Sequence, residues 1–176
     1  MPITAATELL RDRGAGEIAH PGGTLLAHLE RVHALLRRWD APAHIRMAGL
    51  THAFYGADGS PAALGHIGDR HVLSAAVGAE AEELVYFYGA CDRAHTHPRL
   101  VQDGGTYRDR FTGTISLAPE PIRRGFAEIT VANELDVMRA SPEMRARHGR
   151  GLRELFLSWQ PLISEPAGQA VRTSLP

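Results

Sequence analysis

Two histidines stand in glycine-marked stretches that are about one helix and a short turn apart. His28 ends the run His20-Pro-Gly-Gly-Thr-Leu-Leu-Ala-His28, and His52 ends the run Ala48-Gly-Leu-Thr-His52. Imidazole binds divalent metals and also transfers protons near neutral pH. The spacing therefore indicates a site in which both rings act, either as metal ligands or as acid and base.

Each histidine also has a structural interpretation. A single histidine on an apolar helix is more often a packing or surface residue than a ligand, and the chain contains ten histidines. The functional prediction therefore rests on His28 and His52 taken together.

Apolar residues recur at helical spacing along most of the 176 residues. This periodicity predicts helices over about 4–13, 25–36, 42–54, 69–77, 79–88, 122–138 and 152–162. Aromatic and β-branched residues between 104 and 120 instead favour a short hairpin or an extended loop. We therefore expect one all-α domain over residues 1–165, with a small extended or β-hairpin excursion near 105–120. The tail over 166–176 is expected to be flexible.

Composition excludes several classes of protein. The net charge of −1 gives no field that would gather nucleic acid or an anionic membrane. Cys91 is the only cysteine, so an intramolecular disulfide and a four-cysteine zinc site are both excluded. The first residues lack the pattern of a signal peptide, and no stretch has the ~20 apolar residues of a membrane span. The sequence predicts a cytoplasmic protein with a small-molecule substrate, and leaves a homodimer open.

The order of several motifs resembles the HD superfamily, and within it the hydrolase domains of the RelA/SpoT type. The resemblance covers roughly residues 20 to 138. It is carried by His28, by Ala48-Gly-Leu-Thr-His52, by Ala81-Glu-Glu-Leu-Val-Tyr-Phe and by Ala132-Asn133-Glu134-Leu135. The chain is also similar to a bacterial group of uncharacterised proteins that share the stretches 20–28, 48–56, 88–93 and 132–135. The first resemblance implies a helical HD-like fold with a divalent metal.

The resemblance also implies a ligand set. His28 matches the first ligand, His52 matches the histidine of the His-Asp pair, and Glu134 lies closest to the late acidic position, with Asn133 and Asp136 as neighbours. Ala53 stands where the family has the Asp after the second histidine. This departure favours one metal (Mn, Fe or Zn) over two. The pair of catalytic acids that follows His-Asp in RelA/SpoT-type enzymes is absent, which disfavours hydrolysis of a guanosine polyphosphate.

Asn133 and Glu134 point about 100° apart around a helix, so we expect only one of them to face the site directly. If it is Glu134, His28, His52 and Glu134 form a two-His, one-carboxylate triad that suits iron as well as zinc or manganese. If it is Asn133, the pocket has lost its metal and Asn133 binds substrate.

Four further residues are candidates around this centre. His20 lies at a helix entrance, where free backbone N–H groups favour an anion, and Tyr55 follows His52 by one turn. Asp92 and Arg93 can orient a carboxylate or phosphate. We assign catalytic roles to His20, Tyr55 and Asp92 and a substrate-binding role to Arg93. The structural alternatives are a loop histidine, a core tyrosine and an ion pair.

Three functions remain open from the sequence. The first is a metal-dependent hydrolase acting on a phosphorylated or otherwise anionic metabolite. The second is a metal-free HD-derived protein that performs acid/base, lyase or cyclase chemistry, or only binds a ligand. The third is a mononuclear iron oxygenase. A purely structural module is disfavoured, because His, Tyr, Asp and Arg are costly to gather unless they are used.

Overall fold

The structure is a computed structural model that describes residues 3–60, 63–102 and 104–176. It confirms an all-α fold with small hairpin excursions. The α-helices are α1 (Ile3–Asp12), α2 (Leu25–Arg38), α3 (Ala43–Thr51), α4 (Arg70–Val77), α5 (Ala79–Ala90), α6 (Arg93–Thr96), α7 (Glu120–Ala140), α8 (Pro142–Ser158) and α9 (Glu165–Ser174). Short 3₁₀ turns at Ile67–Asp69 and His97–Arg99 precede α4 and follow α6.

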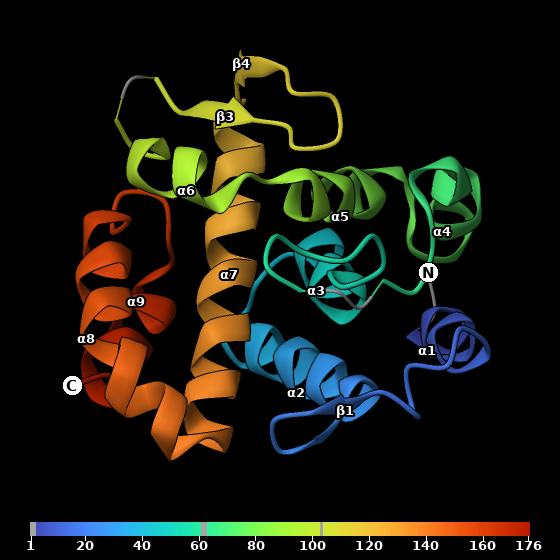
Figure 1. Ribbon diagram of the computed structural model, residues 1–176, viewed down its shortest axis with the longest axis horizontal. Coiled ribbons are helices and arrows are strands. Elements are labelled where there is room, and N and C mark those ends of the chain that lie inside the picture. Colours follow the sequence, from blue (N-terminus) through green and yellow to red (C-terminus); the bar gives the residue numbers. More distant parts are fainter. Residues whose placement is uncertain (1–2, 61–62, 103) are drawn as a thin grey trace.

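Helix α7 runs through the middle of the molecule (Figure 1). Helices α2, α3 and α5 pack against one side of it, and α8 and α9 pack against the other. Most residues of α7 between Gly125 and Met138 are buried, because helices cover it on both sides. Polar side chains on this part of α7 must therefore find partners inside the protein.

Helices α2 and α3 pack closely, which places His28 near His52. Thr24 caps α2 by accepting a hydrogen bond from the backbone N–H of Ala27. Gly49 of α3 lies against Leu36 of α2, where a Cβ atom would collide with the leucine side chain. The absence of that atom lets the two helix backbones approach each other.

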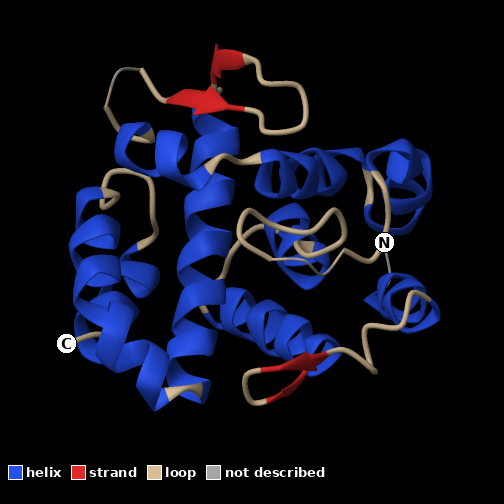
Figure 2. Cartoon of the chain, in the orientation of Figure 1, coloured by secondary structure: helices blue, strands red, loops and turns tan. Residues whose placement is uncertain are grey.

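Two antiparallel strand pairs leave the helical core (Figure 2). β3 (Thr106–Arg108) pairs with β4 (Ile115–Leu117), which confirms the expected excursion near 105–120. β1 (Ala19–His20) pairs with β2 (Gly23–Thr24) around a tight turn that the sequence analysis did not predict. Gly22 and Gly23 adopt positive φ angles of 80° and 133° there, a backbone conformation that glycine adopts readily. This turn fixes the position of His20.

The expectation of a flexible tail over 166–176 is wrong, because this segment forms most of α9. Ser164 caps the helix through Ala167, and Pro166 stands in the first turn, where it needs no amide hydrogen. Val171 and Leu175 are buried against the core. The short amphipathic pattern became a helix because α7 and α8 offer it an apolar surface.

Helix α8 begins at Pro142, ten residues before the predicted start at 152. Its first turns are polar and exposed, so they carry no apolar periodicity that a sequence reading could detect. Ser141 caps this end by accepting from the backbone N–H of Met144. No helix in the described residues is long and apolar enough to cross a membrane.

Replacing Val171 with Ala should lower the free energy of unfolding by about 2 kcal/mol, because a fully buried side chain loses two methyl groups and leaves a cavity. Thr173→Ala on the exposed face of α9 should change it by less than about 0.5 kcal/mol. Urea unfolding of both variants checks this. Equal stability of Val171→Ala and the unmodified protein would show that α9 does not stabilise the fold.

Candidate functional site

A cavity of about 410 Å³ opens where the β1–β2 turn, the end of α3, the end of α5 and the middle of α7 meet. Its apolar wall includes Ile18, Leu25 and Val137. Its polar lining consists of His20, His52, Ser60, Tyr88, Arg93, Asn133 and Glu134. The structure therefore brings together in one cavity five of the residues that the sequence analysis selected.

His28 lies beneath this cavity and is fully buried. Its Nδ1 donates to Oδ2 of Asp136 at 2.8 Å, and its Nε2 lies 2.9 Å from Oδ1 of Asn133. The Asn133 amide nitrogen donates to Oε1 of Glu134 at 3.2 Å, which turns the carboxamide oxygen toward His28. Asp136 and Asn133 therefore engage both nitrogens of His28.

Asp136 is the partner that fixes His28. Its carboxylate also accepts a bidentate contact from Arg31, with Nε–Oδ1 and Nη2–Oδ2 distances of 2.9 Å, and a hydrogen bond from Arg139 at 3.1 Å. Burial alone would raise the pKa of Asp136. The hydrogen bonds from His28 and Arg31 outweigh burial and hold this pKa well below its usual range. Asp136 is therefore ionised wherever the protein is folded near neutral pH.

His52 is held as a neutral ring. Its Nδ1 donates to the backbone carbonyl of Gly49 at 2.8 Å, which leaves the lone pair on Nε2. Burial, with a smaller contribution from the nearby His28, lowers the pKa of His52 to about 3. The ring meets His28 edge to face at 5.5 Å between centroids and Tyr88 at 4.9 Å. His52 thus offers the cavity a hydrogen-bond acceptor.

His20 stacks on His28 with ring centroids 4.1 Å apart and the planes 27° from parallel. Burial lowers the pKa of His20, and the proximity of His28 lowers it further. Its buried Nδ1 has no hydrogen-bond partner among the described residues. The ring also lines the cavity, and a neutral imidazole there can accept a proton or a hydrogen bond from a bound molecule.

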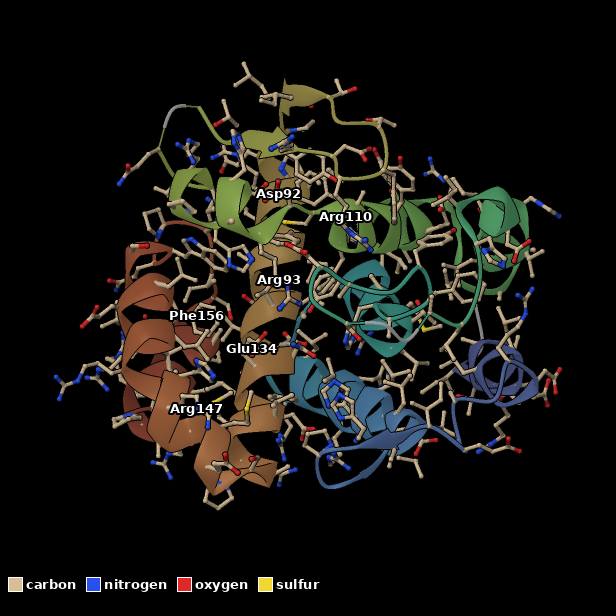
Figure 3. All side chains as sticks on the ribbon, in the orientation of Figure 1. Asp92, Arg93, Arg110, Glu134, Arg147 and Phe156 are labelled. Carbon is tan, nitrogen blue, oxygen red and sulfur yellow. The ribbon has the colours of Figure 1, made fainter. Side chains whose placement is uncertain are left out.

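Arg93 and Glu134 lie close together near the middle of the molecule (Figure 3). Their side chains are 3.4 Å apart between Nη1 and Oε1, and Nη2 of Arg93 donates to the Tyr88 hydroxyl at 3.2 Å. The Arg93 backbone N–H donates to Asp58. The contact to Glu134 is long and the Arg93 side chain is 31 % exposed, so the guanidinium can also bind an anion that enters the cavity.

The donor set does not fit the metal centre that the sequence resemblance implies. Both nitrogens of His28 are engaged by Asp136 and Asn133, and the Glu134 carboxylate pairs with Arg93. Ala53 supplies no ligand. Over residues 3–60, 63–102 and 104–176, no group of three or more His, Cys, Asp or Glu side chains is arranged to hold a metal ion. Metal binding by His28, His52 and Glu134 stays a prediction without support from this geometry.

Asn133 and Glu134 both line the cavity, so the expectation that only one would face it is wrong. Asn133 points inward to His28, whereas Glu134 extends along the wall to Arg93. Side chains can lean across the 100° between neighbouring helix positions, so both residues reach the cavity.

Tyr55 and Asp92 lie outside the lining of the cavity. The Tyr55 hydroxyl donates to Glu82 at 2.8 Å, and burial and this bond raise its pKa. Asp92 caps α6 by accepting from the backbone N–H of His95, and it pairs with Arg108 at 3.4 Å. The geometry gives both residues structural roles, so their predicted catalytic roles have no support here.

Two residues of the site were missed or undervalued by sequence reasoning. Tyr88 lines the cavity and contacts Arg93, and its position five residues before Arg93 was the available signal. Asp136 was only a neighbour of the favoured Glu134, although it stands three positions after Asn133 and thus on the same helix face. That spacing could have assigned Asn133 and Asp136 to the two nitrogens of one ring.

Comparison with known proteins adds a family match but no activity. A model of a domain of unknown function, DUF6817, matches residues 9–93. This range contains His20, His28, His52 and Arg93, whereas the α7 residues of the site lie beyond it. No curated protein and no solved structure matches the chain. The function must therefore be argued from the site.

Asp136→Asn should lower the free energy of unfolding at pH 7 by about 3 kcal/mol, because it leaves His28 and Arg31 without their shared carboxylate. The folded-state pKa of Asp136 is depressed, so its contribution is present above the unfolded pKa near 3.9 and is lost as pH falls toward the folded pKa. Urea unfolding at several pH values checks this. The exposed Asp12→Asn is the control, and an equal loss in both variants would contradict the assignment.

His52 should stay neutral in the folded protein down to about pH 4, because its pKa is lowered to about 3 by burial. The unfolded chain takes up this proton near pH 6.5, so stability should fall as pH drops from about 6.5 toward 3. Imidazole ¹⁵N NMR reports the state directly and should show the Nδ1–H tautomer throughout this range. Protonation of His52 near pH 6.5 would overturn the buried, neutral assignment.

Proposed function

We propose that the protein is a metal-independent enzyme that performs imidazole acid/base chemistry on a small anionic molecule. The observation that carries the proposal is the convergence of His20, His52 and Arg93 on one cavity, above the buried His28–Asp136 pair. A concave site with a few convergent polar groups and perturbed pKa values is the usual form of a small-molecule active site. The HD-like origin of the fold and the cytoplasmic location belong to the same proposal.

Arg93 is the anion-binding group of this proposal. Among the described residues that line the cavity it is the one Arg or Lys, and Tyr88 and Glu134 hold it at the wall. A carboxylate or phosphate that displaces the long contact to Glu134 gains a bidentate, charge-assisted partner. This contact would fix the substrate so that its reacting atoms lie beside the histidines.

His20 is the proton acceptor. Its pKa is lowered, so the ring is neutral near pH 7, and it lines the cavity, whereas His28 is buried and hydrogen-bonded at both nitrogens. Burial, and after it the stacked His28 ring, lower the pKa of His20 and keep it in the proton-accepting form. With a pKa of about 3, His52 is too weak a base for proton transfer at neutral pH and instead accepts a hydrogen bond from the substrate.

The test uses protein dialysed against EDTA and incubated in D₂O with a panel of small 2-oxo acids, 3-hydroxy acids and sugar phosphates. Proton NMR should show loss of a C–H signal or a new product for at least one compound. His20→Gln should slow this reaction at least ~100-fold, the usual size of a general-base contribution. Arg93→Gln should mainly raise KM. The exposed His148→Gln and Arg150→Gln are matched controls and should leave both constants unchanged.

Two results would overturn the proposal. Activity that appears only after Mn²⁺, Fe²⁺ or Zn²⁺ is added, and that is lost in His28→Ala and His52→Ala, would support the metal-dependent hydrolase or the oxygenase expected from the sequence. Saturable binding of panel compounds through Arg93 with no turnover would leave the cavity as a ligand-binding site.

A further inference from the structure

A second cavity lies on the other side of Asp136 from His28. It has a volume of about 550 Å³ and is bounded by α2, α7, α8 and α9. Figure 1 shows the C-terminal half of α7 running between α2 and the α8–α9 pair. This volume falls within the range of small-molecule sites, and nothing in the proposed reaction uses it.

Charge in this second cavity is strongly one-sided. Four arginines and one aspartate line it, a surplus of three positive charges: Arg31, Arg38, Arg139, Arg145 and Asp136. Arg31 and Arg139 pair with Asp136. Within the part of the chain that the structure describes, Arg38 and Arg145 form no ion pair. Two guanidinium groups from different helices are thus available to an anion.

The floor of the second cavity is apolar. Leu135 and Met138 of α7 are buried beneath it, and Leu35 of α2 and Ala170 of α9 form its sides. An inorganic anion would leave this surface uncovered. A molecule that combines an anionic head with a short hydrocarbon body would satisfy both the arginines and the floor.

We propose that the cavity between α2, α7, α8 and α9 is a second binding site, for a small amphipathic anion such as an alkyl phosphate or alkyl carboxylate. The head lies between Arg38 and Arg145, and the hydrocarbon body lies on Leu135 and Met138. This inference does not depend on the proposed activity of the first cavity, because its test measures binding alone.

Binding of a ligand in the second cavity should affect the first cavity through Arg31 and Asp136. Arg31 lines the second cavity, binds Asp136 and donates to the carbonyls of Pro21 and Gly22, which directly follow His20. A negative charge held beside Arg31 and Asp136 alters the electrostatic surroundings of the contacts that fix both His28 and the β1–β2 turn. Binding in the second cavity should therefore shift the imidazole ¹⁵N signals of His20 and His28.

The test is calorimetric titration of the full chain at low salt with hexyl phosphate, inorganic phosphate and hexanol. Hexyl phosphate should bind at least about tenfold more tightly than either of the other two. The double variant Arg38→Gln, Arg145→Gln should weaken its binding at least about tenfold. A charge-matched control, Arg11→Gln with Arg150→Gln, removes two exposed arginines outside the cavity. It should change the Kd for hexyl phosphate less than about twofold.

Several outcomes would overturn the site. Equal weakening in both double variants would mean attraction by overall charge. Loss of binding in Arg93→Gln alone would place the ligand in the first cavity. Hexyl phosphate that binds no better than inorganic phosphate would remove the apolar part of the proposal.

Co-sedimentation with vesicles of equal parts phosphatidylcholine and phosphatidic acid distinguishes a free small-molecule ligand from a lipid head group. Hexyl phosphate binding without sedimentation supports a free molecule. Sedimentation that is lost in Arg38→Gln, Arg145→Gln but kept in the control pair supports a lipid head group in the same site.

Discussion

The contact between His28 and Asp136 joins α2 to α7 inside the protein, and the rest of the site depends on it. Both side chains are almost completely buried, so neither can exchange its partner for water. Arg31 reaches the same carboxylate from α2 one turn further on, which supplies the positive charge that a buried aspartate requires. The pair thus helps to fix how α2 lies on α7, the helix that contributes Asn133, Glu134 and Val137 to the first cavity.

The other side chains of the site are arranged around this contact by packing and by hydrogen bonds. Asn133 closes the free side of His28, His20 stacks on the ring, and His52 meets its edge. Burial keeps His52 neutral, whereas Asp136 and Asn133 engage both nitrogens of His28. Three neighbouring histidines therefore have different surroundings, because His20 and His52 line the cavity and His28 is enclosed by its two hydrogen-bond partners.

The two cavities lie on opposite sides of the same helix, α7. The first cavity presents one cation, Arg93, among neutral imidazoles, whereas the second presents a surplus of arginines over an apolar floor. Asp136 stands between them and is ion-paired on the side of the second cavity. A ligand that binds in the second cavity would alter the electrostatic surroundings of His28 and His20, since Asp136, His28 and His20 interact at short range.

The sequence by itself determined the helices with strong apolar periodicity and the excursion near 105–120, because periodicity carries that information. It also singled out His20, His28, His52, Arg93 and Asn133, which the structure brings together. It could not reveal α9, whose ten residues form a helix only against α7 and α8. It also could not choose between a metal ligand and a hydrogen-bond partner for His28. The partners of His28 lie more than a hundred residues away in the sequence, on α7. Only the tertiary packing of α2 on α7 determines that they are Asn133 and Asp136.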